Sequence, residues 1–186
     1  MRLVLLGAPG SGKGTQGGAL SERLGVPHVA TGDLLRDVAS KDPDGEIAQC
    51  LERGELVRDD LLFDALGDVL VGAAESGGYI LDGFPRTRAQ AERLEGISGP
   101  DAVVYLDLPD DVARQRMAQR AEEEDRADDA DPDVIERRLR LFHEEAKPLL
   151  EFYRERGRLT SVDASPPPDD VSAAILDVLP SGQGQT

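Results

Sequence analysis

The chain has 186 residues, of which 39% are hydrophobic, so it has the length of one domain and enough apolar side chains to bury a core. Its formal net charge of −16 argues against broad binding to nucleic acid or to an anionic membrane, because both need a basic face. A single cysteine, Cys50, excludes an internal disulfide, and with only 2 histidines a zinc site of the usual ligand set is out of reach.

Short β-like runs alternate with helical patterns along the chain, which is typical of an α/β domain with a parallel sheet. We expect strands at 2–6, 27–30, 78–82, 102–106 and 159–163. We expect helices at 13–24, 60–76, 88–95, 110–121, 133–156 and 169–179. Residues 31–60 are interpreted as short helices broken at "KDPDG" and "ERGE", and residues 122–132 as a polar loop. The tail 180–186 has nothing to bury and is predicted to be disordered.

The first informative stretch is "GAPGSGKGTQ", residues 7–16, which follows an apolar run. Its glycines let backbone N–H groups approach an anion, and the helical pattern after it adds the partial positive charge of a helix N-terminus. The pattern G-x-x-x-x-G-K-[ST] is met at Gly7, Gly12 and Lys13, but Gly14 follows and the hydroxyl comes one place later, at Thr15. We expect a phosphate site with Lys13 on the β- and γ-phosphates; the alternative is a glycine-rich turn without a ligand.

A second stretch, "YILDGFPRT" at 79–87, is an apolar strand that ends in Asp82. A carboxylate at the end of a strand beside a phosphate loop can hold the hydration shell of a magnesium ion. Arg86 follows on the same rim, where its guanidinium can clamp phosphate oxygens through two N–H groups. Apolar runs that end in Asp are common, so this interpretation depends on the loop upstream.

A third stretch, "VATGDLLRD" at 29–37, comes at the end of a short predicted strand. Thr31 and Asp33 are candidates for helix caps, which is the structural alternative to a role in a site. Arg36 offers a second cation for a phosphate group.

Together these segments resemble the adenylate kinase family. The resemblance rests on "GAPGSGKGTQ", "TGDLLR", "GELV" at 54–57, "LDGFPRT" with Gln90, and the arginines at 120, 126 and 138. In this family a glycine follows the lysine of the phosphate loop and a threonine comes next, as in Gly14 and Thr15. The resemblance runs from residue 1 to about 179 and implies a P-loop NTPase fold of three layers, with a five-stranded parallel sheet flanked by helices.

The resemblance also implies the organisation of the chain: a core at 1–179, a nucleoside-monophosphate-binding insertion at 31–60 and a lid at 121–132. Some members carry a long lid, which can bind zinc through cysteines. Here only "AEEED" separates Arg120 from Arg126, so the chain is similar to the short-lid form, which needs no zinc.

Functional positions carry over residue by residue. The resemblance implies that ATP is bound by Gly10, Ser11, Gly12, Lys13, Gly14, Thr15, Arg120 and Pro166. It implies that AMP is bound by Thr31, Arg36, Glu55, Leu56, Val57, Gly83, Phe84, Pro85, Arg86, Gln90, Arg126 and Arg138. It implies that catalysis depends on Lys13, Arg86, Arg120, Arg126 and Arg138. It implies that Mg²⁺ is held through water by Thr15 and Asp82.

The implied activity is reversible phosphoryl transfer from ATP to AMP, by a monomer in the cytoplasm with neither nucleic acid nor membrane as a partner. Thr31 and Gln90 favour AMP as acceptor, and a UMP/CMP kinase is the nearest alternative. A nucleotide-dependent switch is a third reading, although a switch does not need a second pair of phosphate-binding arginines such as Arg36 and Arg86. An extra residue near "ADPD" leaves open whether Arg137 or Arg138 faces the site.

Overall fold

The structure, a computed structural model, describes residues 1–124 and 131–180, except for the side chains of residues 123 and 124. The strands are β1 (Arg2–Gly7), β2 (His28–Ala30), β3 (Tyr79–Asp82), β4 (Ala102–Asp107) and β5 (Leu159–Asp163). The helices are α1 (Lys13–Leu24), α2 (Thr31–Lys41), α3 (Glu46–Arg53), α4 (Asp59–Glu75), α5 (Arg88–Ser98), α6 (Asp110–Glu124), α8 (Pro132–Glu155) and α9 (Pro168–Val178).

The five strands of the described residues run parallel in one sheet, in the order β2-β3-β1-β4-β5. This confirms the predicted five-stranded parallel sheet. β1 lies in the centre, and its residue Leu5 aligns with Asp82 of β3 on one side and with Val104 of β4 on the other. The chain leaves β1 toward β2 and later crosses to β4, so the loop after β1 lies where the strand order reverses. Open α/β sheets bind ligands at the carboxyl ends of the strands at such a point.

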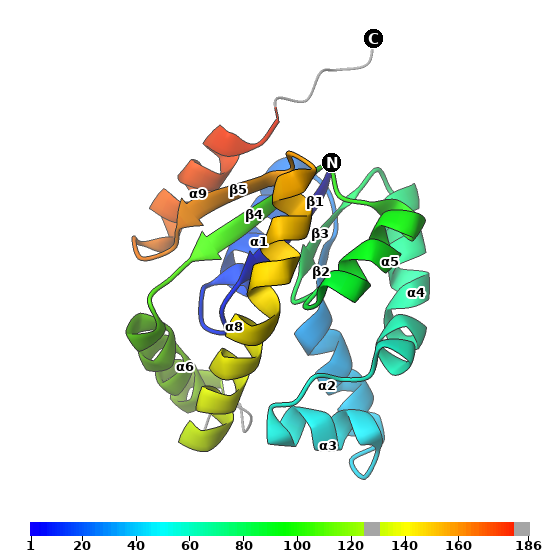
Figure 1. The fold of residues 1–186 in the computed structure, drawn as a ribbon, viewed down its shortest axis with the longest axis vertical. Coiled ribbons are helices and arrows are strands. Elements are labelled where there is room, and N and C mark those ends of the chain that lie inside the picture. Colours follow the sequence, from blue (N-terminus) through cyan, green and yellow to red (C-terminus); the bar gives the residue numbers. More distant parts are fainter. Residues whose placement is uncertain (125–130, 181–186) are drawn as a thin grey trace.

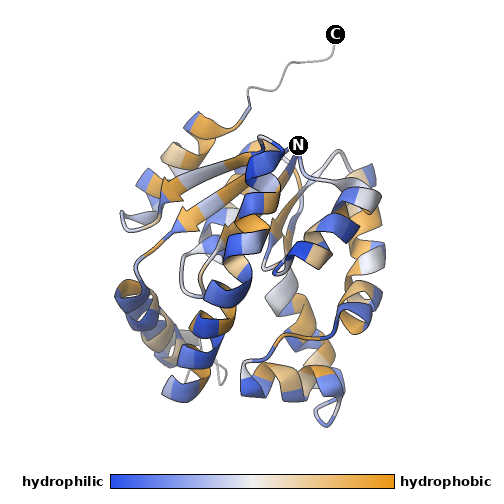
Figure 2. Ribbon diagram, in the orientation of Figure 1, coloured by the Kyte–Doolittle hydropathy of each residue, from blue (hydrophilic) through white to orange (hydrophobic). Residues whose placement is uncertain are grey.

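Helices cover both faces of the sheet, because successive residues of a buried strand point to opposite sides. Val4 and Leu6 of β1 pack in one hydrophobic cluster with α4, α5 and the C-terminal part of α8. Leu3 and Leu5 pack in a second cluster with α1, α6 and α9. Figure 1 shows the two helical layers, and Figure 2 shows apolar strands between them. The predicted three-layer α/β fold is confirmed.

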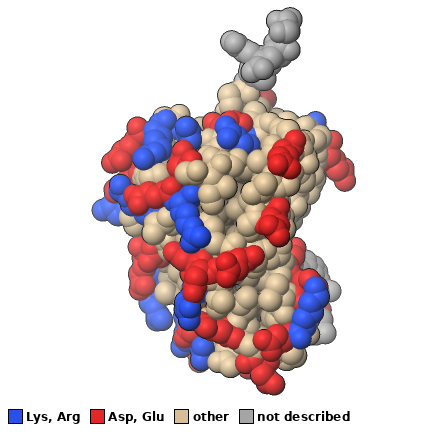
Figure 3. Space-filling view, turned by 90° about the vertical axis from the view of Figure 1, so that its right-hand side faces the viewer, with Lys and Arg blue, Asp and Glu red and all other residues tan. Residues whose placement is uncertain are grey.

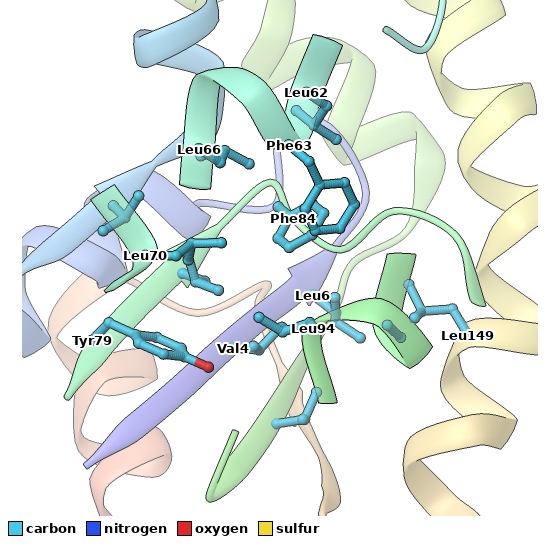
Figure 4. Close-up of a cluster of buried hydrophobic side chains, with 14 of the residues drawn as sticks. Val4, Leu6, Leu62, Phe63, Leu66, Leu70, Tyr79, Phe84, Leu94 and Leu149 are labelled. Carbon is cyan, nitrogen blue, oxygen red and sulfur yellow. The ribbon is translucent and has the colours of Figure 1, made fainter. Parts of the chain in front are cut away.

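A pair of phenylalanines anchors the segment that follows β3. Phe63 of α4 and Phe84 meet edge to face, with ring centroids 5.3 Å apart and an interplanar angle of 86°. Figure 4 shows the two rings beside Val4 and Leu6 of the central strand. Aromatic pairs in this geometry add to the free energy gained from burial. The packing fixes residues 83–86 against the core, and these residues carry much of the candidate site.

Two groups of helices extend beyond the carboxyl ends of the strands. Figure 1 shows α2 and α3 on one side, and α6 with the first half of α8 on the other. α2 and α3 confirm the short helices predicted within 31–60. α6 continues to Glu124, beyond its predicted end at 121, because Ala and Glu are strong helix formers. Residues 125–130 of the predicted lid and 181–186 of the predicted tail lie outside the described residues.

Charged side chains of both signs cover the exterior. On the face drawn in Figure 3, basic side chains stand among acidic ones and form no continuous patch. Some are paired, for example Lys41 with Asp37 at 2.6 Å, and exposed pairs of this kind contribute little to stability. In the part of the chain that the structure describes, none of the helices combines the length and the apolar run that crossing a bilayer requires.

Truncation of the central strand tests the proposed core. Leu5 is fully buried between β3 and β4, so Leu5→Ala leaves a cavity and is expected to lower the free energy of unfolding by about 2–5 kcal/mol. Urea denaturation followed by circular dichroism measures the change. Val71→Ala is the matched control, because Val71 is 49% exposed on α4 and its loss is expected to change stability by no more than about 0.5 kcal/mol. Equal effects of the two substitutions would contradict this account of the core.

Candidate active site

Glycines shape the loop between β1 and α1. Gly10 and Gly12 have φ angles of +80° and +87°, in the left-handed region that favours glycine. A Cβ on Gly10 would lie 2.7 Å from the carbonyl oxygen of Ala113, so the loop packs directly against α6. Gly12 is the N-cap of α1 and has no side chain with which to cap the first N–H groups of the helix. Those N–H groups therefore face the loop as an anion-binding surface.

Lys13 opens α1 and turns back over this loop. Its Nζ donates hydrogen bonds to the carbonyl oxygens of Gly7 and Ala8, each at 2.9 Å. The side chain is half-buried. The ammonium group is therefore held beside the backbone of the loop instead of extending into solvent.

Positive charge from distant segments gathers around Lys13. Burial lowers the pKa of Lys13 to about 8, and although Asp82 acts against this shift, the charges of three arginines add to it: Arg86, Arg138 and Arg120. Arg86 follows β3, Arg120 lies on α6 and Arg138 lies on α8. The fold thus concentrates cations at one point of a chain whose formal net charge is −16.

A cavity of about 1020 Å³ lies in front of these cations, at the upper end of the sizes usual for small-molecule sites. Its walls include many of the residues predicted from the sequence: Gly10, Ser11, Gly12, Lys13, Gly14, Thr15, Arg36, Leu56, Asp82, Gly83, Pro85, Arg86, Arg120, Arg138 and Pro166. A smaller pocket shares Leu56, Gly83 and Arg86 with it and adds four more predicted residues: Thr31, Glu55, Val57 and Gln90.

Two predicted residues are placed differently from the others. The side chain of Phe84 is fully buried in the core and lines neither the cavity nor the smaller pocket. Arg126 lies outside the described residues. The remaining predicted residues meet at the carboxyl edge of the sheet, although their positions in the chain run from 10 to 166.

The smaller pocket contains polar groups from two elements. Thr31 is the first residue of α2 and Ala30 is the N-cap, so the alternative in which Thr31 caps this helix is wrong. Thr31 is 1% exposed, and its Oγ1 has no hydrogen-bond partner among the described residues. Gln90 of α5 is 2% exposed and accepts a hydrogen bond from the backbone N–H of Arg86 at 2.7 Å. A buried hydroxyl and a buried amide beside apolar side chains such as Leu35 and Leu62 can recognise a polar ligand edge.

Asp82 lies between the phosphate loop and β2. A Cβ on Gly14 would lie 3.5 Å from Asp82 Oδ2, and Nε2 of His28 lies 3.8 Å from the same oxygen. Magnesium prefers oxygen ligands and keeps several of its waters, so the carboxylate of Asp82 and the hydroxyl of Thr15 fit an ion bound to phosphates. Within the described ranges, no cluster of three or more His, Cys, Asp and Glu side chains could hold a metal.

Arg138 and Arg137 face in different directions, which answers the question left open by the sequence. Arg138 lines the cavity. Arg137 donates a hydrogen bond to Oε1 of Glu55 at 3.3 Å. α8 therefore contributes one arginine to the cavity and uses its neighbour to contact the turn at 54–57.

Arg116 is a residue of the cavity wall that the sequence analysis missed. Its guanidinium donates to the carbonyl oxygens of Ala164 at 3.0 Å and Ser165 at 3.2 Å, and so holds the loop that precedes Pro166. Arg116 lies one helical turn before Arg120, and this spacing was a signal that could have found it.

Asp59, at the start of α4, was also missed. Its Oδ1 accepts a hydrogen bond from Nε2 of Gln90 at 2.7 Å. The two residues lie 31 positions apart, so no local pattern in the sequence indicates the contact.

Comparison with known proteins identifies the family to which this arrangement belongs. The family model described as adenylate kinase matches residues 5–158. The chain belongs to the adenylate kinase family. A protein named adenylate kinase from Stenotrophomonas maltophilia is 43% identical over 96% of this chain and 99% of its own length. Proteins of the same name from Cyanothece sp. and Xylella fastidiosa are each 42% identical, over 99% and 96% of this chain and 97% and 99% of their own lengths.

Membership of the adenylate kinase family confirms the resemblance seen in the motifs. The chain is a phosphotransferase of the kinase class and binds ATP.

The lowered pKa of Lys13 predicts proton uptake on nucleotide binding. Above about pH 8, Lys13 is largely neutral in the free protein. Phosphate oxygens favour the charged form of Lys13. Nucleotide binding is therefore expected to raise the pKa of Lys13 and to take up a proton. Calorimetric titration with a non-hydrolysable MgATP analogue at about pH 9, in buffers of different ionisation enthalpy, measures that uptake.

One variant and one control test whether Lys13 takes up this proton. Lys13→Met is expected to remove the uptake and to weaken binding, whereas Lys41→Met, which changes an exposed lysine of α2, is expected to leave both unchanged. Binding without proton uptake in the unsubstituted protein would contradict the assignment of Lys13 to the phosphates.

Proposed function

We infer that this protein catalyses the reversible transfer of a phosphoryl group from ATP to AMP, giving two ADP. The observation that carries this conclusion is the convergence of Lys13, Arg86, Arg120 and Arg138 on one cavity. The reaction must bring two polyanions into contact, and their mutual repulsion is the first obstacle to in-line attack. A cluster of cations between a phosphate loop and a second pocket offsets that repulsion.

The donor ATP is assigned to the phosphate loop and the elements that flank it. The backbone from Gly10 to Thr15 would wrap its phosphates, with Lys13 on the transferred group. Arg120 and the carbonyl of Pro166 would lie against the adenine side of the donor. The contacts of the loop with α6, and of Arg116 with the carbonyls before Pro166, support this assignment.

The acceptor AMP is assigned to the side of the cavity formed by α2, the turn at 54–57 and residues 83–86. Arg36 and Arg86 would hold its phosphate, while Thr31 and Gln90 would contact its adenine. Glu55, Leu56 and Val57 would contribute main-chain contacts, as would Gly83, Phe84 and Pro85. The position of Arg86 in both the cavity and the smaller pocket supports a continuous path from base to phosphate.

The chemistry needs positioning and charge more than it needs a base. The attacking oxygen of AMP is already anionic at neutral pH, so no side chain has to remove a proton from it. Positioned donors stabilise the charge that spreads over the phosphoryl group during transfer. We assign this role to Lys13, Arg86, Arg120 and Arg138, together with Arg126, which the structure does not describe.

Magnesium is proposed to enter with the nucleotide. Asp82 and the hydroxyl of Thr15 would hold it through its waters, and the ion would supply positive charge to the phosphate oxygens. The oxygen donors at the mouth of the phosphate loop fit this role.

Two segments are proposed to exclude water once both nucleotides are bound. The insertion at 31–60 would cover the acceptor, and the short lid at 121–132 would cover the donor. Exclusion of water prevents hydrolysis of ATP in place of transfer. Since one chain supplies both sides of the cavity, we also propose that the enzyme works as a monomer, in the cytoplasm.

Replacement of Arg86 tests the function and its acceptor. In an assay of ADP formation from MgATP, we expect AMP to be preferred over UMP, CMP and GMP. Arg86→Ala is expected to lower the rate about 10³-fold or more, by analogy with other arginines that contact a transferring phosphoryl group. Arg88→Ala is the matched control, because Arg88 lies two residues along the chain and pairs with Glu92 at the surface.

The outcomes of this assay differ clearly. Transfer to UMP or CMP instead of AMP would keep the chemistry and overturn the assignment of Thr31 and Gln90. A full rate in Arg86→Ala would overturn the assignment of the cation cluster.

Replacement of Asp82 tests the magnesium assignment. Asp82→Asn keeps the shape of the side chain and removes its charge, so the free Mg²⁺ concentration for half-maximal activity is expected to rise about 10–100-fold. Asp107→Asn is the matched control, because Asp107 ends the strand β4 and lies outside the cavity wall. An unchanged magnesium requirement in Asp82→Asn would remove Asp82 from the proposed site.

A further inference from the structure

The side-chain amide of Gln90 is held at both of its polar ends. Its Oε1 accepts from the backbone N–H of Arg86 at 2.7 Å, and its Nε2 donates to Oδ1 of Asp59 at 2.7 Å. Gln90 is 2% exposed on α5, whereas Asp59 is an exposed residue at the start of α4. The contact therefore joins two helices through a buried amide and a carboxylate that reaches it from the surface.

The chemistry of these two partners decides which way the amide points. A backbone N–H can only donate, and an ionised carboxylate can only accept. If the amide of Gln90 turned over, its NH₂ group would meet the N–H of Arg86 and its oxygen would meet the carboxylate of Asp59. Both hydrogen bonds would be lost and replaced by repulsion, so a single orientation is favoured.

The amide keeps capacity for a ligand after both contacts are made. An amide oxygen has two lone pairs and an NH₂ group has two donors, so one of each is left. Gln90 lines the smaller pocket together with Thr31, whose buried Oγ1 has no partner within the described part of the chain. The fixed amide of Gln90 and the hydroxyl of Thr31 thus lie in the same pocket, and the proposed function places the base of the acceptor there.

The order of donor and acceptor on the amide distinguishes two kinds of purine. Adenine donates from its 6-amino group and accepts at N1, whereas a 6-oxopurine accepts at O6 and donates from N1. In the proposed function Arg36 and Arg86 hold the phosphate, so the base would present one fixed edge to the amide. An amide in the observed orientation therefore complements adenine, and a 6-oxopurine would require the opposite orientation.

We propose that Asp59 is a positioning residue that locks the amide of Gln90 and thereby selects adenine over 6-oxopurine in the acceptor. This inference rests on the proposed function, because it assumes that the acceptor base occupies the smaller pocket. Asp59 acts through Gln90 and need not touch the substrate.

The test compares AMP with inosine monophosphate, which differs from AMP at positions 1 and 6 of the base. Asp59→Asn removes the charge and lets the side chain either donate or accept. At nearly constant volume it therefore removes the directional signal at the Nε2 end of the amide and leaves the N–H of Arg86 as the remaining one. We expect the ratio of kcat/KM for AMP to kcat/KM for inosine monophosphate to fall about tenfold. The fall in this ratio should come from the KM values of the two monophosphates. The kcat for AMP should change less than about twofold.

Asp60→Asn is the matched control. Asp60 is the next carboxylate in the first turn of α4, and it pairs with Arg58 at the surface instead of with Gln90. Both substitutions remove one negative charge from the same helix N-terminus, so their effects on the helix dipole are matched. Only Asp59→Asn is expected to change the selectivity ratio.

Each outcome has one meaning. If the unsubstituted enzyme transfers nothing to AMP, the proposed function fails. If it phosphorylates AMP and Asp59→Asn keeps the full selectivity, this inference fails and the proposed function stands. If Asp59→Asn unfolds, Asp59→Ser gives the same test, because serine suits a helix start. Dissociation constants for the two monophosphates, measured without ATP, test the selectivity independently of turnover.

Discussion

Repulsion among like charges is the constraint on which the site depends. Lys13, Arg86, Arg120 and Arg138 come from four segments and share one cavity. Burial is the main cause of the lowered pKa of Lys13, and the charges of the three arginines lower it further. Separate helices and strands can hold such a cluster because the carboxyl ends of parallel strands meet at one edge of the sheet. In the proposed function, a polyanionic ligand turns this unfavourable arrangement into a favourable one, and binding energy is concentrated where the two phosphoryl groups would meet.

The buried strands support the site, and the helices beyond their carboxyl ends surround the cavity. β1, β3 and β4 are almost wholly buried, and the contact of Phe63 with Phe84 fixes the segment that leads to Arg86. α2 and the turn at 54–57 on one side, and α6 with α8 on the other, carry residues that line the cavity (Figure 1). The contact between Arg137 and Glu55 joins the two sides.

Local patterns were enough to predict the strands and most helix bounds. The helix at 13–24 was predicted to the residue, because a glycine-rich loop precedes it and Gly25 ends it in the left-handed region. The end of α6 was predicted too early, since acidic residues suit a solvated helix as well as a loop. The contact of Asp59 with Gln90 and the choice between Arg137 and Arg138 depend on which distant elements meet, and one sequence does not contain that information.

The environment of Lys13 also sets its reactivity as an amine. A pKa of about 8 leaves a substantial neutral fraction near pH 7.5, more than about a hundredfold above that of a lysine with the ordinary value. Only the neutral amine attacks electrophiles such as activated esters and aldehydes. The lowered pKa thus favours attack by Lys13 on such reagents, and a bound nucleotide, by restoring the charge of Lys13, would also act as its protecting group.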